Sequence, residues 1–439
     1  MNKRRLSCLA ALLMLLACWG CGSDTATDAS TLTLSGGLSG NDIAQNAAQS
    51  VNVALREMDN FFFTDTMLLN QLVTHDKSVD IYYVEGSMVS TDIIFRKDFA
   101  APIVHPELAE DIAGMYRPLR EAVTKEQTIM GMPIYVAAQE YCLAYDLTVY
   151  DMCLEEGYAL PTSWLQLLEQ IAQWDETLWQ RQITPVGMDA RKLVQITLDY
   201  IMAQQQAKGG EIGFSAEDNV ALIDVAYRAG QAMSAHQMDR KEHILFRRQG
   251  LTVGHSEMEG LHTYAMPLRD EDTPIIPLRI CVAFINPYSP KQDLAQAYLA
   301  AYYDQMDPML RMALSPQANQ TMESPQALEQ MKQLQETIQW LESALVEAES
   351  APDKKELETQ LAECRRQLEL AEKNRYQVDE ASLAAYGETM QYGVVLTEQL
   401  WQDQSVSQLI EQLVQGKMTP PDFCRELERV VQMKEAERG

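Results

Sequence analysis

Residues 278–304, LRICVAFINPYSPKQDLAQAYLAAYYD, contain the pattern that decides the fold. The first eight residues are mostly apolar, as expected for a buried strand. Asn286 and Pro287 then interrupt the run, and after Ser289-Pro290 the apolar side chains recur at helical spacing over 291–304. A buried strand followed by a short break and a helix is typical of α/β proteins.

The same alternation of strand and helix runs through most of the chain. Strands are expected at residues 31–35, 50–55, 79–84, 132–145, 183–186 and 243–246. Helices are expected at residues 65–75, 147–157, 161–174, 192–207 and 216–235, and at 106–123 with a break at Pro118. Strands that alternate with helices in this way predict an α/β fold.

Composition excludes two classes of partner. The chain has 439 residues, 46% of them apolar, which is enough for two or three domains with large cores. It has 35 Lys and Arg against 63 Asp and Glu, a formal net charge of −28. Such an anionic protein is a poor partner for nucleic acid and for anionic lipid, because both require clustered cations.

The N-terminus has the features of an export signal. Positive residues at 3–5 precede an apolar run, residues 6–17, that is too short to span a bilayer. The run ends in Leu15-Leu16-Ala17-Cys18, which resembles the bacterial lipobox. We therefore expect a signal peptide at 1–17, acyl chains such as palmitate on Cys18, and a flexible tether at 18–30. The protein is then a lipoprotein on the extracytoplasmic face of the cell membrane.

Three other interpretations of this N-terminus remain open. The first is an ordinary cleaved signal peptide followed by a chance cysteine. In the second, Cys21 rather than Cys18 is the acylated residue. In the third, Cys18 and Cys21 form a redox Cys-x-x-Cys pair, although no βαβ pattern precedes them.

Four motifs, in this order and spacing, resemble the family 1 extracellular solute-binding proteins of ABC importers, which include maltose- and oligosaccharide-binding receptors. The motifs are Val79-Asp80-Ile81, the group formed by residues 131–134, 143–146, 157 and 161–164, the stretch 284–298, and Gly416-Lys417-Met418-Thr419. Asp146 stands where the family usually has Asn, and Ser163 intrudes before Trp164. We expect Trp164 to pack at the start of a helix.

The resemblance implies two α/β lobes joined by hinge strands, the two-lobe fold of type II periplasmic binding proteins. Lobe one is expected at 31–138 and 280–315, and lobe two at 139–279 and 316–439. Such a receptor captures a small solute, here expected to be a carbohydrate, between its lobes and delivers it to a membrane permease. A non-transport binding or scaffold protein that retains the fold is the alternative.

The expected ligand-binding residues lie at strand ends and at the first crossing between the lobes, because ligands of open α/β sheets bind there. They are Ser35, Gly36, Glu85, Ser87, Tyr135, Gln139, Glu140, Asp189, Arg191 and Arg247. Gln139 is chosen from its position in related sugar receptors. Alternatively, Arg247 is a surface cation that pairs with a carboxylate, or it binds an anionic ligand. No tryptophan is evident at the cleft positions.

Residues 325–376 depart from the family pattern. Met331, Leu334, Ile338, Leu341 and Leu345 are spaced by three and four residues. A second such series follows Ala351-Pro352-Asp353 and consists of Leu357, Leu361, Cys364, Leu368 and Ala371. Two heptad seams separated by a breaker predict an antiparallel helical hairpin inserted in lobe two. This hairpin either docks a partner or stabilises the lobe. Trp340 does not belong to either seam.

No sequence motif supports catalysis, a cofactor or a metal site. The Gly-rich segment 36–40 lacks the lysine of a phosphate-binding loop and the spacing of a nucleophile elbow. The six histidines form no His-x-x-x-His pair, and Asp270-Glu271-Asp272 lacks the glycine and terminal glutamate of a calcium loop. We therefore expect a binding protein, not an enzyme.

Overall fold

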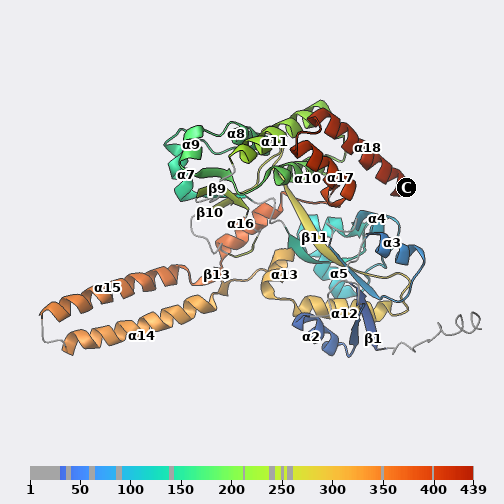
Figure 1. Cartoon of the computed structure of the whole chain (residues 1–439). Helices are drawn as coiled ribbons and strands as arrows, with labels where there is room; N and C mark the ends of the chain where they lie inside the picture. Colours follow the sequence, from blue (N-terminus) through green and yellow to red (C-terminus); the bar gives the residue numbers. More distant parts are fainter. Residues whose placement is uncertain are drawn as a thin grey trace, which may run out of the picture.

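The chain forms two lobes, each built around its own sheet, and a long helical arm that projects from them (Figure 1). This is a computed structural model, and it describes residues 30–35, 41–58, 65–85, 91–137, 143–210, 213–236, 243–248, 252–254, 261–347, 351–397 and 400–438. We call the six-stranded sheet with its helices lobe one, and the four-stranded sheet with its helices lobe two. The arm consists of α14 (Pro325–Glu347) and α15 (Ala351–Lys373). The expected two-lobe α/β fold is confirmed.

The sheet of lobe one is organised around one long strand. Its order is β14 (Gly393–Val395), β11 (Ile276–Ile285), β3 (Ile81–Glu85), β1 (Thr31–Ser35) and β2 (Ala54–Glu57), with β6 (Met132–Ala137) also paired with β11. Strands β1, β2 and β3 are parallel, whereas β11 runs antiparallel to β3 and β6. The last five residues of β11 pair with β3, and its first three pair with β14.

The helices of lobe one are α2 (Asp42–Ser50), α3 (Asp65–Val73), α4 (Thr91–Arg96), α5 (Pro106–Ala113), α6 (Arg117–Ala122), α12 (Gln292–Gln305) and α13 (Pro308–Leu314). The strand expected at 50–55 is wrong at its start, because α2 continues to Ser50 and a turn with Asn52 at φ 55° precedes β2. The break expected at Pro118 lies just before this residue, because α5 ends at Ala113 and α6 begins at Arg117. Pro118 itself lies in the first turn of α6, where its missing N–H has no cost.

The sheet of lobe two has the order β10 (Leu261–Tyr264), β7 (Leu143–Asp146), β9 (His243–Arg248) and β8 (Ile183–Val186). Its helices are α7 (Leu147–Leu154), α8 (Trp164–Ala172), α9 (Glu176–Gln180), α10 (Ala190–Lys208), α11 (Glu217–Ala235), α17 (Gln404–Val414) and α18 (Pro420–Arg438). In the part of the chain that the structure describes, no helix combines the length and apolar character needed to cross a membrane.

Helix caps explain the two departures from the family pattern. The carboxylate of Asp146 accepts hydrogen bonds from the backbone N–H groups of Thr148 and Val149, at 3.0 and 3.2 Å, and so caps α7. The Ser163 hydroxyl accepts from Gln166 N at 3.2 Å and caps α8. Asp and Ser are favoured at this position because they satisfy free N–H groups. Both departures are therefore compatible with the same local structure.

Trp164 packs in the core of lobe two, as expected. Its side chain is buried, and its indole N–H donates to the Thr197 hydroxyl at 2.9 Å. The ring stacks on Tyr200, with the ring centroids 5.3 Å apart. This tryptophan therefore holds α8 against α10.

A buried carboxylate joins two of the motifs that define the fold. Asp80, which is 3% exposed, accepts hydrogen bonds from Thr33 N at 2.8 Å and from the Ser289 hydroxyl at 2.5 Å. The Lys291 ammonium lies 3.8 Å from the same carboxylate. The Asn286 amide donates to Val79 O at 2.7 Å. These contacts tie β1, β3 and the turn between β11 and α12 together.

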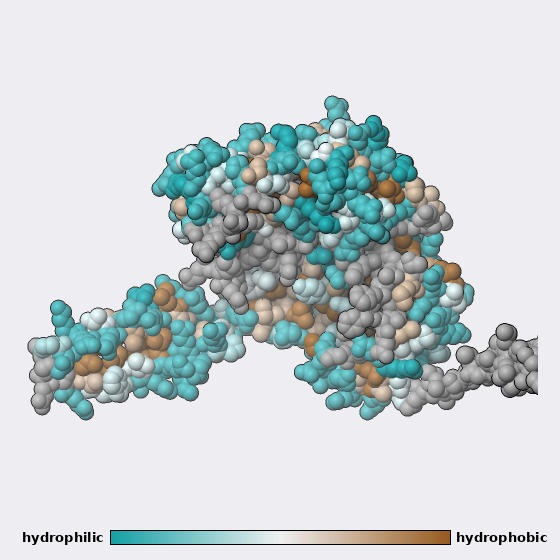
Figure 2. All heavy atoms as spheres, in the orientation of Figure 1, coloured by the Kyte–Doolittle hydropathy of each residue, from teal (hydrophilic) through white to brown (hydrophobic). Residues whose placement is uncertain are grey.

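The helical arm has the predicted hairpin structure. Helix α14 (Pro325–Glu347) and α15 (Ala351–Lys373) pack along each other and project away from both lobes (Figure 1). The described residues of both predicted seams are buried or half-buried, with Leu341 and Leu361 among the most buried. Figure 2 shows a mostly hydrophilic outer surface on the arm, with scattered hydrophobic patches. Trp340 is 63% exposed and lies off the seam.

Two short strands form the base of the arm, β12 (Met322–Glu323) and β13 (Tyr376–Val378). The Arg375 guanidinium donates to Glu323 at 2.6 Å across them. Gln377 contacts Met309 of lobe one through its side chain. Its backbone oxygen lies only 2.6 Å from the place where a Cβ on Gly254 would be. The base therefore contacts α13 of lobe one and the segment 252–254. Only glycine fits at position 254.

The segment after the arm returns to the lobes. Helix α16 (Glu380–Met390) contacts lobe one, because the Tyr386 hydroxyl donates to Ala313 O at 2.8 Å and its ring meets Tyr116 edge-on. Helices α17 and α18 pack on α10 and α11 of lobe two. The remaining short elements are β4 (Thr124–Lys125), β5 (Thr128–Ile129), η1 (Pro316–Ala318) and η2 (Leu400–Gln402).

Replacing Asp80 with Ala is expected to lower the free energy of unfolding by about 3 kcal/mol, because buried donors of Thr33 and Ser289 lose their acceptor. Urea denaturation followed by circular dichroism measures this loss. The control is Asp98→Asn, which removes an exposed ion pair with Lys125 and is expected to cost less than about 1 kcal/mol. Equal losses for both variants would contradict the structural role of Asp80.

Replacing both Leu341 and Leu361 with Ala is expected to open the arm without unfolding the lobes, because these side chains fill its seam. A loss of at least about 2 kcal/mol in local stability raises amide hydrogen exchange in α14 and α15 by at least about 30-fold. Exchange mass spectrometry measures it peptide by peptide. Trp340→Ala is the matched control, and a comparable acceleration in that variant would contradict the assigned seam.

Candidate functional site

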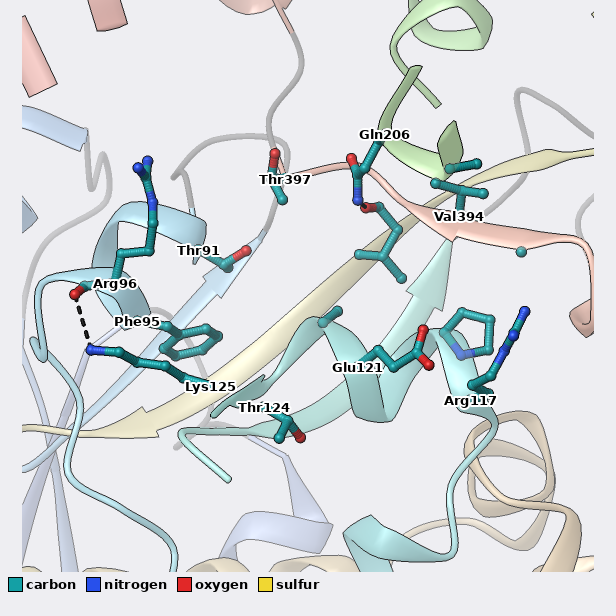
Figure 3. Close-up of a pocket in the computed structure, with 15 residues that line it drawn as sticks. Thr91, Phe95, Arg96, Arg117, Glu121, Thr124, Lys125, Gln206, Val394 and Thr397 are labelled. Atoms are coloured by element: carbon teal, nitrogen blue, oxygen red, sulfur yellow. Dashed lines mark hydrogen bonds between the residues drawn. The ribbon is translucent and has the colours of Figure 1, made fainter. Parts of the chain in front are cut away.

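A cavity of about 490 Å³ lies between the two lobes (Figure 3). Lobe one lines it with residues of α4, α6 and β4, and lobe two lines it with Gln206 and Ala207 near the C-terminus of α10. Residues 393–395 of β14 and Thr397 complete the lining. A neighbouring cavity of about 520 Å³ shares Arg117 with the first. A molecule bound here contacts both lobes at once.

Polar and charged side chains make up about half of the described lining of the 490 Å³ cavity. The cations are Arg96, Arg117 and Lys125, and Glu121 is the carboxylate. Hydroxyl groups come from Thr91, Thr124 and Thr397. The Lys125 ammonium is held in place, because it donates to Asp98 at 2.6 Å and to Arg96 O at 3.1 Å.

The aromatic residue in this lining is not placed to stack on a ligand. Phe95 is only 5% exposed, and its ring meets Phe284 edge-on with centroids 6.4 Å apart. Its faces are therefore occupied by the core of lobe one. Among the described lining residues there is no exposed aromatic face of the kind that sugar sites use.

Two of the expected ligand-binding residues lie on the sheet of lobe one, on opposite sides of β11. Glu85 and Tyr135 flank Cys281 in register, one on each neighbouring strand. The Arg279 guanidinium lies 3.8 Å from the Glu85 carboxylate. Burial raises the pKa of the Cys281 thiol, which keeps the thiol neutral at pH 7. Tyr135 is 39% exposed, so its ring is accessible from solvent.

Ser35, at the end of β1, is buried. Its hydroxyl has no hydrogen-bond partner among the described residues. Four other expected residues, Gly36, Ser87, Gln139 and Glu140, lie outside the described residues. Their roles stay predictions.

The expected residues of lobe two have local structural contacts. Asp189 caps α10 by accepting from Lys192 N at 2.8 Å, and Arg191 donates to the Ser407 hydroxyl at 2.6 Å. Arg247 lies on β9 opposite Ala144. Within the described residues, its buried Nε has no hydrogen-bond partner. None of these three residues belongs to the described lining of either cavity.

Trp401, which lies in η2 beside α10, was not predicted from the sequence. Its indole N–H donates to Asp199 Oδ2 at 2.8 Å, and Asp199 is fully buried. The Lys192 ammonium lies over the ring, 4.9 Å from its centroid. The available signal was Asp199 itself, because a carboxylate in the middle of an apolar helix needs a buried donor.

The cavity residues of α4, α6 and α10 were not predicted either, because they lie on helices and not at strand ends. No sequence signal marks them, since the cavity arises where the two lobes meet. Among the described residues, no group of three His, Cys, Asp or Glu side chains lies close enough to hold a metal ion.

Comparison with known proteins gives matches only among solved structures. No model of a known protein family matches the chain, and no curated protein matches it by sequence. Maltose-bound MalE3 of T. maritima superposes with a TM-score of 0.52 at 12% identity, covering 92% of this chain and 99% of that one.

Two further structures give the same result. An ABC transporter solute-binding protein from Agrobacterium radiobacter K84, in complex with ribitol, has a TM-score of 0.52 at 14% identity, covering 91% of this chain and 97% of that one. An ABC substrate-binding protein from Listeria monocytogenes, in complex with cycloalternan, has a TM-score of 0.53 at 12% identity, covering 93% and 100%. At these identities the likeness concerns the fold, and this chain has the two-lobe fold of ABC transporter solute-binding proteins.

Proposed function

We propose that this protein is the lipid-anchored, extracytoplasmic substrate-binding protein of an ABC importer. It captures a small carbohydrate between its two lobes and delivers it to a membrane permease. The observation that carries the proposal is the cavity whose lining comes from both lobes. A solute that contacts both lobes binds the closed form better than the open form, and so shifts the population toward closure.

The size and the polarity of the cavity agree with a small polar solute. Its volume of about 490 Å³ falls within the range of ordinary ligand sites, roughly 300–1,000 Å³. Its hydroxyl and amide groups match the hydroxyl groups of a carbohydrate. The solved structures with this fold carry maltose, ribitol and cycloalternan, which supports the same class of solute for this chain.

The membrane anchor in this proposal rests on the sequence. Cys18 follows the apolar run, and residues 22–30 consist of Gly, Ser, Asp, Thr and Ala, a composition typical of a tether. Two or more acyl chains are needed for durable anchoring, since a single chain binds reversibly. Anchoring keeps the receptor close to the permease and raises its effective concentration there.

The helical arm supports the second candidate, a non-transport binding or scaffold protein. The arm projects from the lobes and presents Trp340, 63% exposed, to solvent. Large exposed aromatic side chains are enriched at protein interfaces. In this alternative the arm engages a surface protein and the cavity has no transport role.

A thermal-shift screen against oligosaccharides, monosaccharides and polyols is expected to find a stabilising solute. At a concentration 100 times the Kd, one bound solute adds about 2.7 kcal/mol to the folded state, which raises Tm by several degrees. Absence of a shift with every solute, together with capture of a surface protein that is lost when residues 325–375 are deleted, would favour the scaffold.

Replacing Cys18 with Ala is expected to release the protein from the membrane fraction into the soluble extracytoplasmic fraction, because the acyl chains are lost. Cell fractionation with immunoblotting measures the distribution, and metabolic labelling with a fatty acid reports acylation directly. Cys21→Ala is the matched control and should stay at the membrane. Release by Cys21→Ala alone would move the anchor to Cys21.

A further inference from the structure

The described lining of the 490 Å³ cavity has a charge opposite to that of the whole chain. The chain has 35 Lys and Arg against 63 Asp and Glu, whereas this lining has three of the former and one of the latter. Hydroxyl groups can be bound by neutral donors and acceptors, so they do not require this reversal. Local cations in an anionic protein favour a ligand that carries negative charge.

Arg117 is the best placed of the three cations. It begins α6, it is exposed, and it lines both interlobe cavities. The second cavity is also lined by Gln204, Ala207 and Lys208, in the last turns of α10, and by the carboxylates of Glu271 and Asp272. A guanidinium recognises a planar carboxylate through two parallel hydrogen bonds, which an ammonium cannot do.

The other lining groups divide into two sets. In Figure 3, Arg96 and Arg117 lie on opposite sides of the cavity, with Glu121 and Thr124 between them. Gln206 and Thr397 lie on the opposite side of the cavity from Glu121 and Thr124. Glu121 and the threonine hydroxyls are suited to sugar hydroxyl groups, since a carboxylate accepts their hydrogen bonds. The guanidinium groups are suited to an anionic substituent on the same molecule.

We propose that the solute is an acidic carbohydrate, whose carboxylate binds the Arg117 guanidinium while its hydroxyl groups bind Glu121 and the threonines. This inference rests on the proposed function and names its substrate class. The missing aromatic platform agrees with it, because the described lining offers cationic side chains for an anionic group and no aromatic face for the apolar face of a sugar. Arg117 is the residue that determines specificity.

Isothermal titration calorimetry on the full chain tests the proposal with pairs of sugars that differ in one group. The pairs are galactose with galacturonate, glucose with glucuronate, and the corresponding neutral and acidic disaccharides; galactose 6-phosphate tests whether a phosphate replaces the carboxylate. We expect the acidic member of at least one pair to bind at least 10-fold more tightly than its neutral counterpart. The Arg117→Gln variant should lose about 10- to 100-fold for the acid and nothing for the neutral sugar.

Two further variants make the test specific. Arg117→Lys keeps the charge but loses the planar fork, so an intermediate loss is expected. Arg120→Gln removes the same charge from the same helix outside both cavities, and should bind like the unaltered protein. An unchanged Tm of the ligand-free variants verifies folding, and an affinity for the acid that is unaffected in Arg117→Gln would overturn the role of Arg117.

The remaining outcomes separate this inference from the proposed function. Equal or tighter binding of the neutral member in every pair would overturn the acidic class and leave sugar capture intact. Tighter binding of the phosphate than of the carboxylates would overturn the carboxylate assignment. Failure of every sugar to bind, acidic or neutral, would overturn the proposed function together with the inference.

Discussion

The geometry of lobe one depends on the hydrogen bonds that the buried carboxylate of Asp80 accepts. This carboxylate binds donors from β1 and from the turn after β11, with the Lys291 ammonium nearby. An uncompensated carboxylate in this position would be costly, so the segments around it are held in one arrangement. The network holds the C-terminal end of β11. The N-terminal end of the same strand pairs with β14 beside the interlobe cavities. The position of the cavity is therefore linked to a polar contact at the other end of the strand.

The strands and helices were largely predictable, because they depend on local periodicity. The strand at 183–186 and the long helices α10 and α11 follow from apolar spacing alone. The start of the strand expected at 50–55 was wrong, because α2 continues to Ser50 and Asn52 tolerates the positive φ of the turn that follows. The break expected at Pro118 lies just before it, because this proline fits the first turn of a new helix. Asp146 and Ser163 departed from the family pattern, yet both are ordinary helix caps.

The candidate site was much less predictable. Glu85 and Tyr135 were expected at the cleft, and the register of β3, β11 and β6 does bring them to either side of Cys281. Arg117 and Gln206 line a cavity from helices of different lobes, and no spacing in the chain relates them. Trp401 pairs with Asp199 across about 200 residues, as a direct consequence of tertiary packing. Local patterns therefore identified the elements, whereas the site depends on how distant elements meet.

The base of the helical arm has an evolutionary consequence. Because Glu323 and Tyr376 lie opposite each other on β12 and β13, the chain leaves the body and returns to it at nearly the same point. A segment attached in this way can be gained or lost in a single insertion or deletion. Its loss leaves a tight turn between β12 and β13. Its length can also change by whole heptads without altering strand register in either lobe. The arm is thus free to diverge among relatives at a rate set by its own role, independently of solute capture.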